Sequence, residues 1–191
     1  MFILLAKLIT ALLILTRYFF WFITENRAKN RVTQKKDIKN IMLGASTDTL
    51  TTVFLIAQLI SSPLLPLHVY KDVVQTTGFI VVLIGFSFLL AARIALAENW
   101  TSAVEAHIKK DHKLITDGVY AFVRHPIYLG YTLLCIGSEM VAGSYLFISF
   151  FVLFYHFYKQ VKQEEALLLN HFGTQYEMYR KKTKMLLPFI L

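Results

Sequence analysis

Apolar residues in this chain come in five long blocks separated by polar connections, and this arrangement constrains the fold more than any other feature. A helix on the surface of a soluble protein carries apolar residues on one face only, whereas a helix surrounded by lipid is apolar all round. Hydrophobic residues make up 56% of the 191 positions and charged residues 17%. A soluble domain of this length cannot bury so much apolar surface. The sequence therefore predicts an all-α polytopic membrane protein.

The predicted membrane helices cover residues 1–23, 49–67, 77–97, 127–142 and 145–158. The first three are long enough to cross about 30 Å of hydrocarbon at about 1.5 Å per residue. The last two are shorter and are joined by Gly143 and Ser144, so we expect a short helical hairpin. Pro63 and Pro66 should end the second helix near its far end. Arg17 lies near one end of the first block, where we expect its side chain to snorkel toward water.

Basic residues concentrate in the connections 25–45 and 98–124 and in the tail after the fifth block. The positive-inside rule places these segments on the cytoplasmic side, so that five crossings put the N-terminus outside. We divide the chain into residues 1–97, three scaffold helices, and residues 98–191, a catalytic half. This topology accounts for the net charge of +8, and nucleic-acid binding is not expected. Cys135 is the single cysteine, which excludes an internal disulfide and a cysteine-based zinc site, and we expect no metal.

Polar residues that could bind a ligand or take part in a reaction lie mostly in the second half of the chain. Residues 112–120 form one patch, and Arg124, His125 and Pro126 open a second patch that extends to Gly130. Pro126 suits the first turn of a helix, because its missing N–H costs nothing there. Arg124 and His125 then lie at the positive end of that helix, where they suit an anionic group such as a carboxylate. The alternative is that Arg124 binds lipid phosphate and His125 caps the helix.

The third patch follows the fifth block. We expect that helix to continue to about Phe172 and to stop at Gly173 in a left-handed conformation. The paired Glu164 and Glu165 then lie one to two turns beyond the membrane face, where a carboxylate can accept hydrogen bonds from ribose hydroxyls or an amino group. The alternative is an exposed glutamate pair that contacts nearby lysines. Further along, Tyr176 and Tyr179 share one helix face, which favours anchoring at the membrane interface.

Together these residues resemble the isoprenylcysteine carboxyl methyltransferase family, which is related to membrane phospholipid methyltransferases. The resemblance covers residues 112–188 and rests on the order Gly118-x-Tyr120-x-x-x-Arg124-His125-Pro126-x-Tyr128-x-Gly130, then Glu164-Glu165-x-x-Leu168-x-x-x-Phe172-Gly173-x-x-Tyr176-x-x-Tyr179, then Pro188. It implies a membrane methyltransferase that uses S-adenosylmethionine, releases S-adenosylhomocysteine and lacks a Rossmann domain. The chain indeed contains no Gly-x-Gly-x-x-Gly motif.

The resemblance also implies a site. The cofactor contacts would come from His112, Lys113, Leu114, Ile115, Tyr120, His125, Pro126, Ile127, Tyr128 and Glu164. We expect His125, helped by Arg124, to face the methionine carboxylate and Glu164 to take the ribose hydroxyls or the amino group. Leu114 and Ile115 would pack on adenine, and Tyr120 and Tyr128 would shape the pocket around the sulfonium. Arg124 and Glu165 are the candidate catalytic residues, and Gln160 and Tyr131 are the candidate substrate-binding residues.

The predicted acceptor is a lipophilic or lipid-modified molecule that enters from the bilayer, among the membrane lipids, while the cofactor enters from the cytoplasm. A carboxylate acceptor is ionised at pH 7 and needs no base. Family members that act on prenylcysteine carry an arginine shortly before the paired glutamates, where this chain has Gln160. The acceptor is therefore left open between a prenylcysteine-like carboxylate and another lipid-like acid, thiol or amine. An amine would need a base, for which Glu165 and His171 are the candidates.

Two other functions fit parts of the sequence. A membrane NADPH-dependent sterol-type reductase also carries an Arg-His-Pro-x-Tyr-x-Gly-like run, but an acidic residue often follows that glycine, where this chain has Tyr131. The other alternative is a non-enzymatic scaffold or lipid-binding protein, which would have no tight nucleotide pocket.

Overall fold

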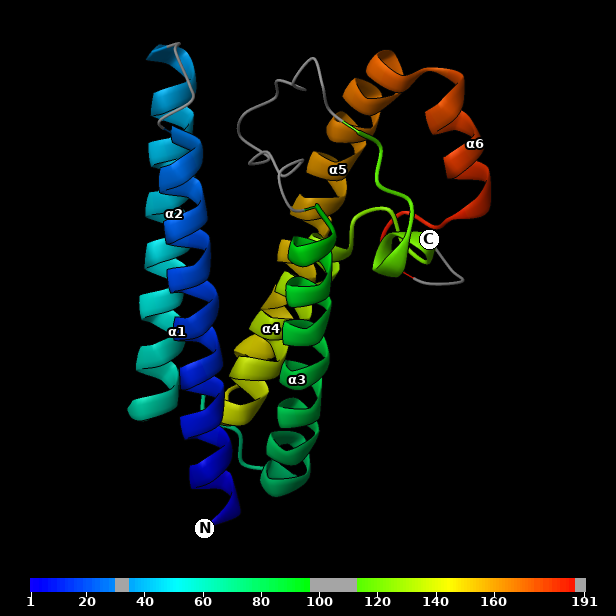
Figure 1. Cartoon of the computed structure of the whole chain (residues 1–191). Helices are drawn as coiled ribbons and strands as arrows, with labels where there is room; N and C mark the ends of the chain where they lie inside the picture. The colour runs from blue at the N-terminus through cyan, green and yellow to red at the C-terminus, as the bar shows by residue number, and fades with distance from the viewer. Residues whose placement is uncertain (30–34, 97–112, 188–191) are drawn as a thin grey trace.

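The computed structural model describes residues 1–29, 35–96 and 113–187, and it describes no side chains between residues 25 and 45 (Figure 1). All the secondary-structure elements in these ranges are helices, so the all-α prediction is confirmed for the described part of the chain. The long helices are α1 (Phe2–Lys29), α2 (Lys35–Ile60), α3 (Lys71–Leu96), α4 (Pro126–Ala142) and α5 (Phe150–Phe172), and a shorter α6 (Thr174–Lys182) follows. Two 3-10 turns, η2 (Gly118–Ala121) and η3 (Tyr145–Ser149), precede α4 and α5.

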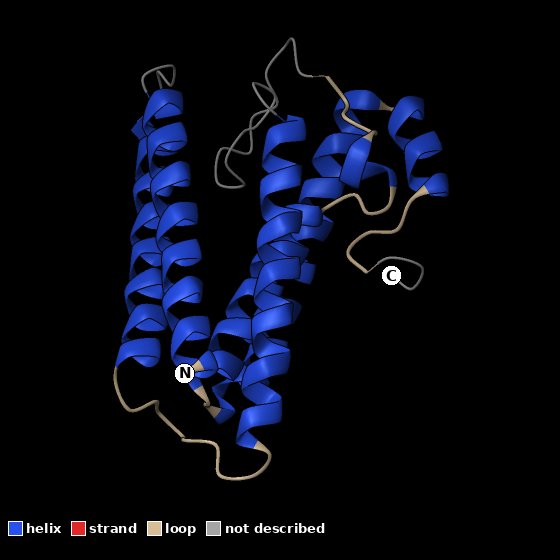
Figure 2. Cartoon of the chain, turned by 60° about the horizontal axis from the view of Figure 1, so that its bottom comes forward, coloured by secondary structure: helices blue, strands red, loops and turns tan. Residues whose placement is uncertain are grey.

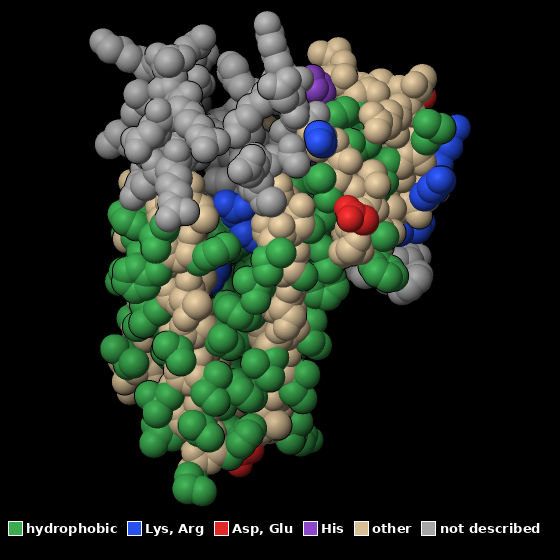
Figure 3. All heavy atoms as spheres, in the orientation of Figure 1, with side chains coloured by type: hydrophobic (Ala, Val, Ile, Leu, Met, Phe, Trp, Pro, Cys, Tyr) green, Lys and Arg blue, Asp and Glu red, His purple; other side chains and the backbone are tan. Residues whose placement is uncertain are grey.

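The long helices run roughly along one axis, with α1 beside α2 and α3 beside α4 (Figures 1 and 2). Helix α5 returns past α4, so that α4, η3 and α5 form the predicted hairpin, and α6 folds back beside the far end of α5. Buried apolar side chains from four helices form the shared core, among them Ile14, Leu55, Leu89 and Leu134. Apolar side chains also cover the outer surface of α1 and α3, whereas Lys and Arg gather along α6 (Figure 3).

Two helical stretches among the described residues are long and apolar enough to cross a membrane, Phe2–Thr24 and Lys71–Leu96. The apolar stretches Ser46–Ile60 and Pro126–Ala142 are shorter. The predicted number of five crossings therefore stays a prediction.

Helix α2 ends at Ile60, before Pro63, so the predicted proline break is confirmed but falls earlier than residue 67. The proline-containing connection is fastened to the turn between α4 and α5. The Leu67 N–H donates to the Gly143 carbonyl at 2.7 Å, and the Ser144 hydroxyl donates to the Leu64 carbonyl at 2.6 Å. These bonds satisfy backbone groups that the interrupted helix leaves without partners.

Glycines allow α3 and α4 to touch backbone to backbone. A Cβ atom added at Gly85 would lie 2.7 Å from the Leu134 nitrogen, and one added at Gly137 would lie 2.7 Å from the Val82 nitrogen. Small residues at such a crossing are the usual means by which helices associate in lipid. The contact fixes the position of α4 and therefore of the residues just before Pro126.

Arg17 points into the helix bundle. Its side chain is 5% exposed, and its Nη2 donates to Asp48 Oδ1 at 2.7 Å and to Thr52 at 3.0 Å. The guanidinium carbon also lies 5.1 Å from the centre of the Tyr131 ring. The predicted snorkelling of Arg17 is therefore wrong, because an aspartate on the neighbouring helix supplies a counter-charge inside the bundle.

Candidate functional site

The residues before α4 are held by a segment from near the end of the chain. The Arg124 N–H donates to the Lys184 carbonyl at 2.8 Å, and the His125 N–H donates to the Met185 carbonyl at 3.1 Å. Val123 and Lys184 form a parallel bridge. Pro126 follows at the first position of α4, as predicted. Backbone pairing therefore fixes Arg124 and His125 at the helix entry.

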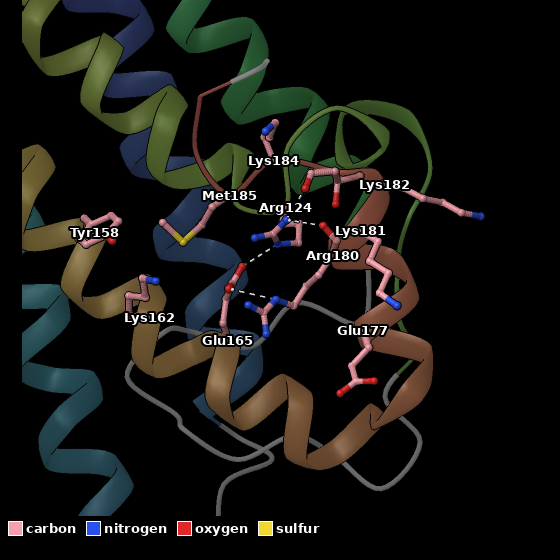
Figure 4. A pocket seen from close by; sticks show the side chains of 11 residues that line it. Arg124, Tyr158, Lys162, Glu165, Glu177, Arg180, Lys181, Lys182, Lys184 and Met185 are labelled. Atoms are coloured by element: carbon pink, nitrogen blue, oxygen red, sulfur yellow. Dashed lines mark hydrogen bonds and ion pairs between the residues drawn. The ribbon is translucent and has the colours of Figure 1, made fainter. Parts of the chain in front are cut away.

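Arg124 and Glu165 form a buried ion pair at the centre of this region (Figure 4). Arg124 Nε donates to Glu165 Oε1 at 2.6 Å, and the side chains are 8% and 7% exposed. Arg124 Nη1 also donates to the carbonyls of Thr183 and Arg180. From α6, Arg180 Nε lies 3.7 Å from the second oxygen of Glu165. One carboxylate thus joins α5, α6 and the entry to α4.

The charge of Glu165 is strongly stabilised. Burial raises its pKa, but the neighbouring His125 and the hydrogen bond and positive charge of Arg124 outweigh burial and lower the pKa to about 2. The group is therefore ionised at physiological pH and is a weak base. This argues against the role of Glu165 as a general base for an amine acceptor. His171, the other candidate base, is exposed and lies six residues further along α5.

His125 is buried between the two glutamates. Its Nδ1 lies 3.6 Å from Glu164 Oε2 and its Nε2 lies 3.5 Å from Glu165 Oε1. It occupies the N-cap position of α4, but its side chain makes no capping hydrogen bond. The alternative role of His125 as a helix cap is therefore wrong.

Three buried polar atoms gather here without a hydrogen bond of normal geometry to any described residue: His125 Nε2, Tyr128 Oη and Glu164 Oε2. The centres of the His125 and Tyr128 rings are 6.1 Å apart, and Glu164 Oε2 lies 3.6 Å from His125 Nδ1, so the three groups lie close together. A buried polar atom without a partner costs about 1–3 kcal/mol. Such a group of donors and acceptors is suited to a polar ligand that completes their hydrogen bonds.

Tyr176 and Tyr179 support this region from α6. They are 1% and 7% exposed, and the Tyr179 hydroxyl donates to the Tyr120 carbonyl at 2.6 Å. Burial raises the pKa of all three tyrosines, so their hydroxyls stay neutral. Their predicted role as interface anchors is wrong, because α6 folds back onto η2 and encloses both rings.

The remaining predicted cofactor residues are only partly placed. Lys113 is exposed and Leu114 and Ile115 are half-buried beside the entry to η2, whereas His112 lies outside the described residues, as does Pro188. In α4, Pro126 is buried and Ile127 packs against the core.

The two predicted substrate residues lie apart from the ion pair. Gln160 is half-buried on α5. The Tyr131 hydroxyl contacts Asp48 at 3.4 Å, and its ring lies 5.8 Å from Phe157, which in turn lies 5.2 Å from Tyr128. Tyr131 therefore belongs to the Arg17–Asp48 cluster and reaches the His125 region only through an aromatic neighbour.

Arg180 and the carbonyl of Thr183 were not singled out from the sequence. Arg180 is the first of a run of basic residues, and in a membrane protein such a run more often faces solvent than lines a site. A backbone acceptor such as Thr183 leaves no signal in the residue pattern.

An open cavity of about 680 Å³ lies beside the ion pair (Figure 4). We call it the basic cavity, because its lining contains six basic residues and two acidic ones. The lining residues are Arg124, Tyr158, Lys162, Glu165, Glu177, Arg180, Lys181, Lys182, Thr183, Lys184 and Met185. Among the described residues, no predicted cofactor contact lines it. The basic cavity is therefore lined by other residues than the predicted cofactor contacts, although His125 also lies beside Glu165.

The helical fold and the apolar outer surface are those of a membrane-embedded protein. Residues 77–170 match the sequence model of the isoprenylcysteine carboxyl methyltransferase (ICMT) family. This region contains Arg124, His125 and both glutamates, so the resemblance to that family predicted from the sequence is confirmed.

Relatives support this assignment. The chain is 35% identical over 121 residues to the protein-S-isoprenylcysteine O-methyltransferase of Schizosaccharomyces pombe, a match that covers 62% of this chain and 51% of the relative. It is 31% identical over 118 residues to the Homo sapiens protein of the same name, with 61% and 42% covered. A solved structure of the eukaryotic intramembrane Ras methyltransferase ICMT matches 83% of this chain and 55% of that chain, with a TM-score of 0.57 and 26% identity. The chain thus matches about half the length of these relatives.

Proposed function

We propose that the chain is an integral membrane methyltransferase that transfers a methyl group from S-adenosylmethionine to a lipophilic acceptor. The observation that carries this proposal is the group of unpartnered buried polar atoms on His125, Tyr128 and Glu164, within the region shared with the methyltransferase family. The relatives are named for O-methylation of S-isoprenylcysteine in proteins, and this reaction is the template for the proposal.

The residues present fit this cofactor. An amino acid carboxylate is complementary to the imidazole of His125, and a ribose hydroxyl or an ammonium group is complementary to the Glu164 carboxylate. Leu114 and Ile115 offer apolar surface for adenine. The chemistry that the cofactor would supply is an electrophilic methyl group on a sulfonium.

The protein contributes mainly positioning. Arg124 is a positioning residue, because its donors reach Glu165 and two carbonyls and thereby hold His125 in place. Glu165 in turn accepts from Arg124 and lies beside His125. Tyr128 and Tyr131 of α4 pack edge-on against Phe157 of α5, and these aromatic contacts would keep water out between the two helices. Without water the positive sulfonium is less well solvated, which favours the loss of its charge when the methyl group leaves.

A carboxylate acceptor fits this arrangement better than an amine. A carboxylate attacks the methyl group without loss of a proton, so no general base is required. Glu165 is a weak base, because its pKa is about 2. We therefore propose a prenylcysteine-like or other lipid-like carboxylate, which enters from the bilayer along α4 and α5.

The topology that accompanies this function is five crossings with the N-terminus outside and the cofactor pocket facing the cytoplasm. The first three helices would serve as the scaffold, and the residues after 98 would carry the catalytic groups. The distribution of lysine and arginine supports this orientation.

Titration calorimetry of the purified chain in detergent tests the function. We expect S-adenosylhomocysteine to bind with micromolar affinity, and His125→Ala or Glu164→Ala to weaken binding at least tenfold. His156→Ala and Glu177→Ala are matched controls, because these residues are exposed and outside the group. Binding of NADPH alone would overturn the proposal in favour of a reductase. Binding of neither ligand would favour the scaffold.

A further inference from the structure

Basic side chains outnumber carboxylates around Glu165. Arg124 makes the short hydrogen bond to this carboxylate, whereas Arg180 approaches only to 3.7 Å and is 42% exposed. Lys162, one turn before Glu165 on α5, lines the same cavity, and its Nζ lies 5.5 Å from the centre of the Tyr158 ring. Two cations therefore contact the Glu165 carboxylate, and the cavity lining as a whole holds six basic residues against two carboxylates, Glu165 and Glu177. The excess of positive charge favours a further anion between Lys162 and Arg180.

The opposite side of the basic cavity is apolar. Tyr158 and Met185 line it, and both pack in the small apolar cluster that contains Val161 and Leu186. In Figure 4, Tyr158, Met185 and Lys162 lie on one side of the open space, while Arg124 and Arg180 point to Glu165 on the other. An occupant would thus meet Lys162 beside the apolar wall on one side and the two arginines with Glu165 on the other.

The apolar wall continues along α5 toward its beginning. Phe151, Val152 and Tyr155 are 70%, 72% and 57% exposed, and they precede Tyr158 on the helix. The surface of α5 therefore changes from exposed apolar residues to lysines within about two turns. Such a change marks the border between hydrocarbon and headgroups in a membrane protein.

We propose that the basic cavity binds the phosphate headgroup of an anionic membrane lipid, with its acyl chains along the exposed apolar face of α5. Lys162 and Arg180 would contact the phosphate, since both carry donors that suit it. Arg124 would keep its bond to Glu165. The site is separate from the cofactor residues and does not depend on the proposed methyl transfer.

Binding of soluble short-chain lipids to the delipidated chain in a nonionic detergent tests this site. We expect dioctanoyl phosphatidylglycerol to bind measurably tighter than dioctanoyl phosphatidylcholine by titration calorimetry or native mass spectrometry. Lys162→Gln and Arg180→Gln should each weaken phosphatidylglycerol binding about fivefold, which is the loss expected for one basic residue near an anionic membrane surface. S-adenosylhomocysteine binding to Lys162→Gln should stay unchanged.

Lys159→Gln is the matched control. Lys159 lies one turn earlier on α5, and its Nζ lies 4.6 Å from the Tyr155 ring, the same arrangement as Lys162 over Tyr158. It does not line the basic cavity. An equal loss of binding in Lys159→Gln would overturn the proposal, because it would indicate general attraction to the positive surface. Equal binding of phosphatidylcholine, or equally tight binding of inorganic phosphate alone, would overturn the assignment to an anionic lipid.

Discussion

Arg124 Nε donates to Glu165 Oε1 at 2.6 Å, although the two residues lie 41 positions apart in the chain. The bond connects the entry to α4 with the middle of α5. Because Arg124 also donates to carbonyls of residues 180 and 183, one side chain joins three segments. The helix hairpin and the C-terminal segment are therefore coupled through a single buried guanidinium.

Removal of that guanidinium should be costly. Arg124→Gln leaves the Glu165 charge buried with a weaker partner, and a broken buried ion pair typically costs about 3–5 kcal/mol. Equilibrium unfolding in mixed detergent micelles should show a loss of this size. Arg180→Gln is the control, since this residue is partly exposed and its loss should cost no more than about 1 kcal/mol. Equal losses in the two variants would contradict a central role for Arg124. The double variant Arg124→Gln/Glu165→Gln should recover part of the stability.

Stability should also depend on pH through Glu165. Its pKa falls from an ordinary value of 4.5 to about 2 in the folded protein, so the unfolded chain takes up the proton first on acidification. The stabilisation from this charge is complete above about pH 4.5 and is lost as the pH falls toward about 2. The difference in thermal midpoint between the native protein and Glu165→Gln should therefore narrow over this window. The exposed Glu177→Gln variant should show no such narrowing. A difference that is constant with pH would refute the assignment.

The hydroxyl of Tyr179 should affect the cofactor site without contact to the ligand. Tyr179→Phe removes the 2.6 Å hydrogen bond to the Tyr120 carbonyl and leaves a buried acceptor without this donor. We expect a loss of about 1 kcal/mol in unfolding free energy and a severalfold weaker affinity for S-adenosylhomocysteine. Tyr155→Phe on the exposed face of α5 should change neither quantity. Unchanged ligand affinity in Tyr179→Phe would show that α6 does not support the site.

Close packing of α3 and α4 should tolerate no added methyl group. Gly137→Ala would place Cβ 2.7 Å from the Val82 backbone nitrogen, and backbone atoms cannot move aside as a flexible side chain can. We expect about 1–3 kcal/mol of destabilisation, as for other overpacked interiors. Ser87→Ala, at an exposed position of α3, is the control and should be nearly neutral. A melting temperature for Gly137→Ala equal to that of the control would mean that the helices are further apart than described.

Local signals in the sequence are sufficient to predict the positions of most helices. The start of α4 at Pro126 and the end of α5 at Phe172 follow from chemistry within a few residues, because proline suits a first helical turn and glycine commonly follows a helix end. The apolar blocks likewise locate the long helices. The conformation predicted for Gly173 is wrong, because its φ of 52° is positive but its ψ of −127° is not that of a left-handed helix. Helix boundaries in the polar connections were less accurate, as α3 begins at Lys71 rather than near residue 77.

The errors concern which way a helix faces. The sequence predicts that Arg17 reaches toward water, but in the structure it pairs with Asp48 on a neighbouring helix. Hydropathy does not define how that helix is rotated, so it does not predict the pair. Tyr176 and Tyr179 have the same spacing whether they face lipid or a protein surface, so only the return of α6 onto η2 decides their burial. The pairing of Arg124 with Glu165 is also not predictable from the sequence, because the residues lie 41 positions apart and either side chain suits a ligand equally well.

The attachment of residues 124 and 125 to residues 184 and 185 has a consequence for biogenesis. Translation at about 5–20 residues per second leaves roughly 3–12 s between the synthesis of the two segments. During that interval the nascent chain can insert its helices, but it lacks the carbonyls that fix Arg124 and His125. Ligand binding at the proposed cofactor site is therefore expected only after the C-terminal segment has been made.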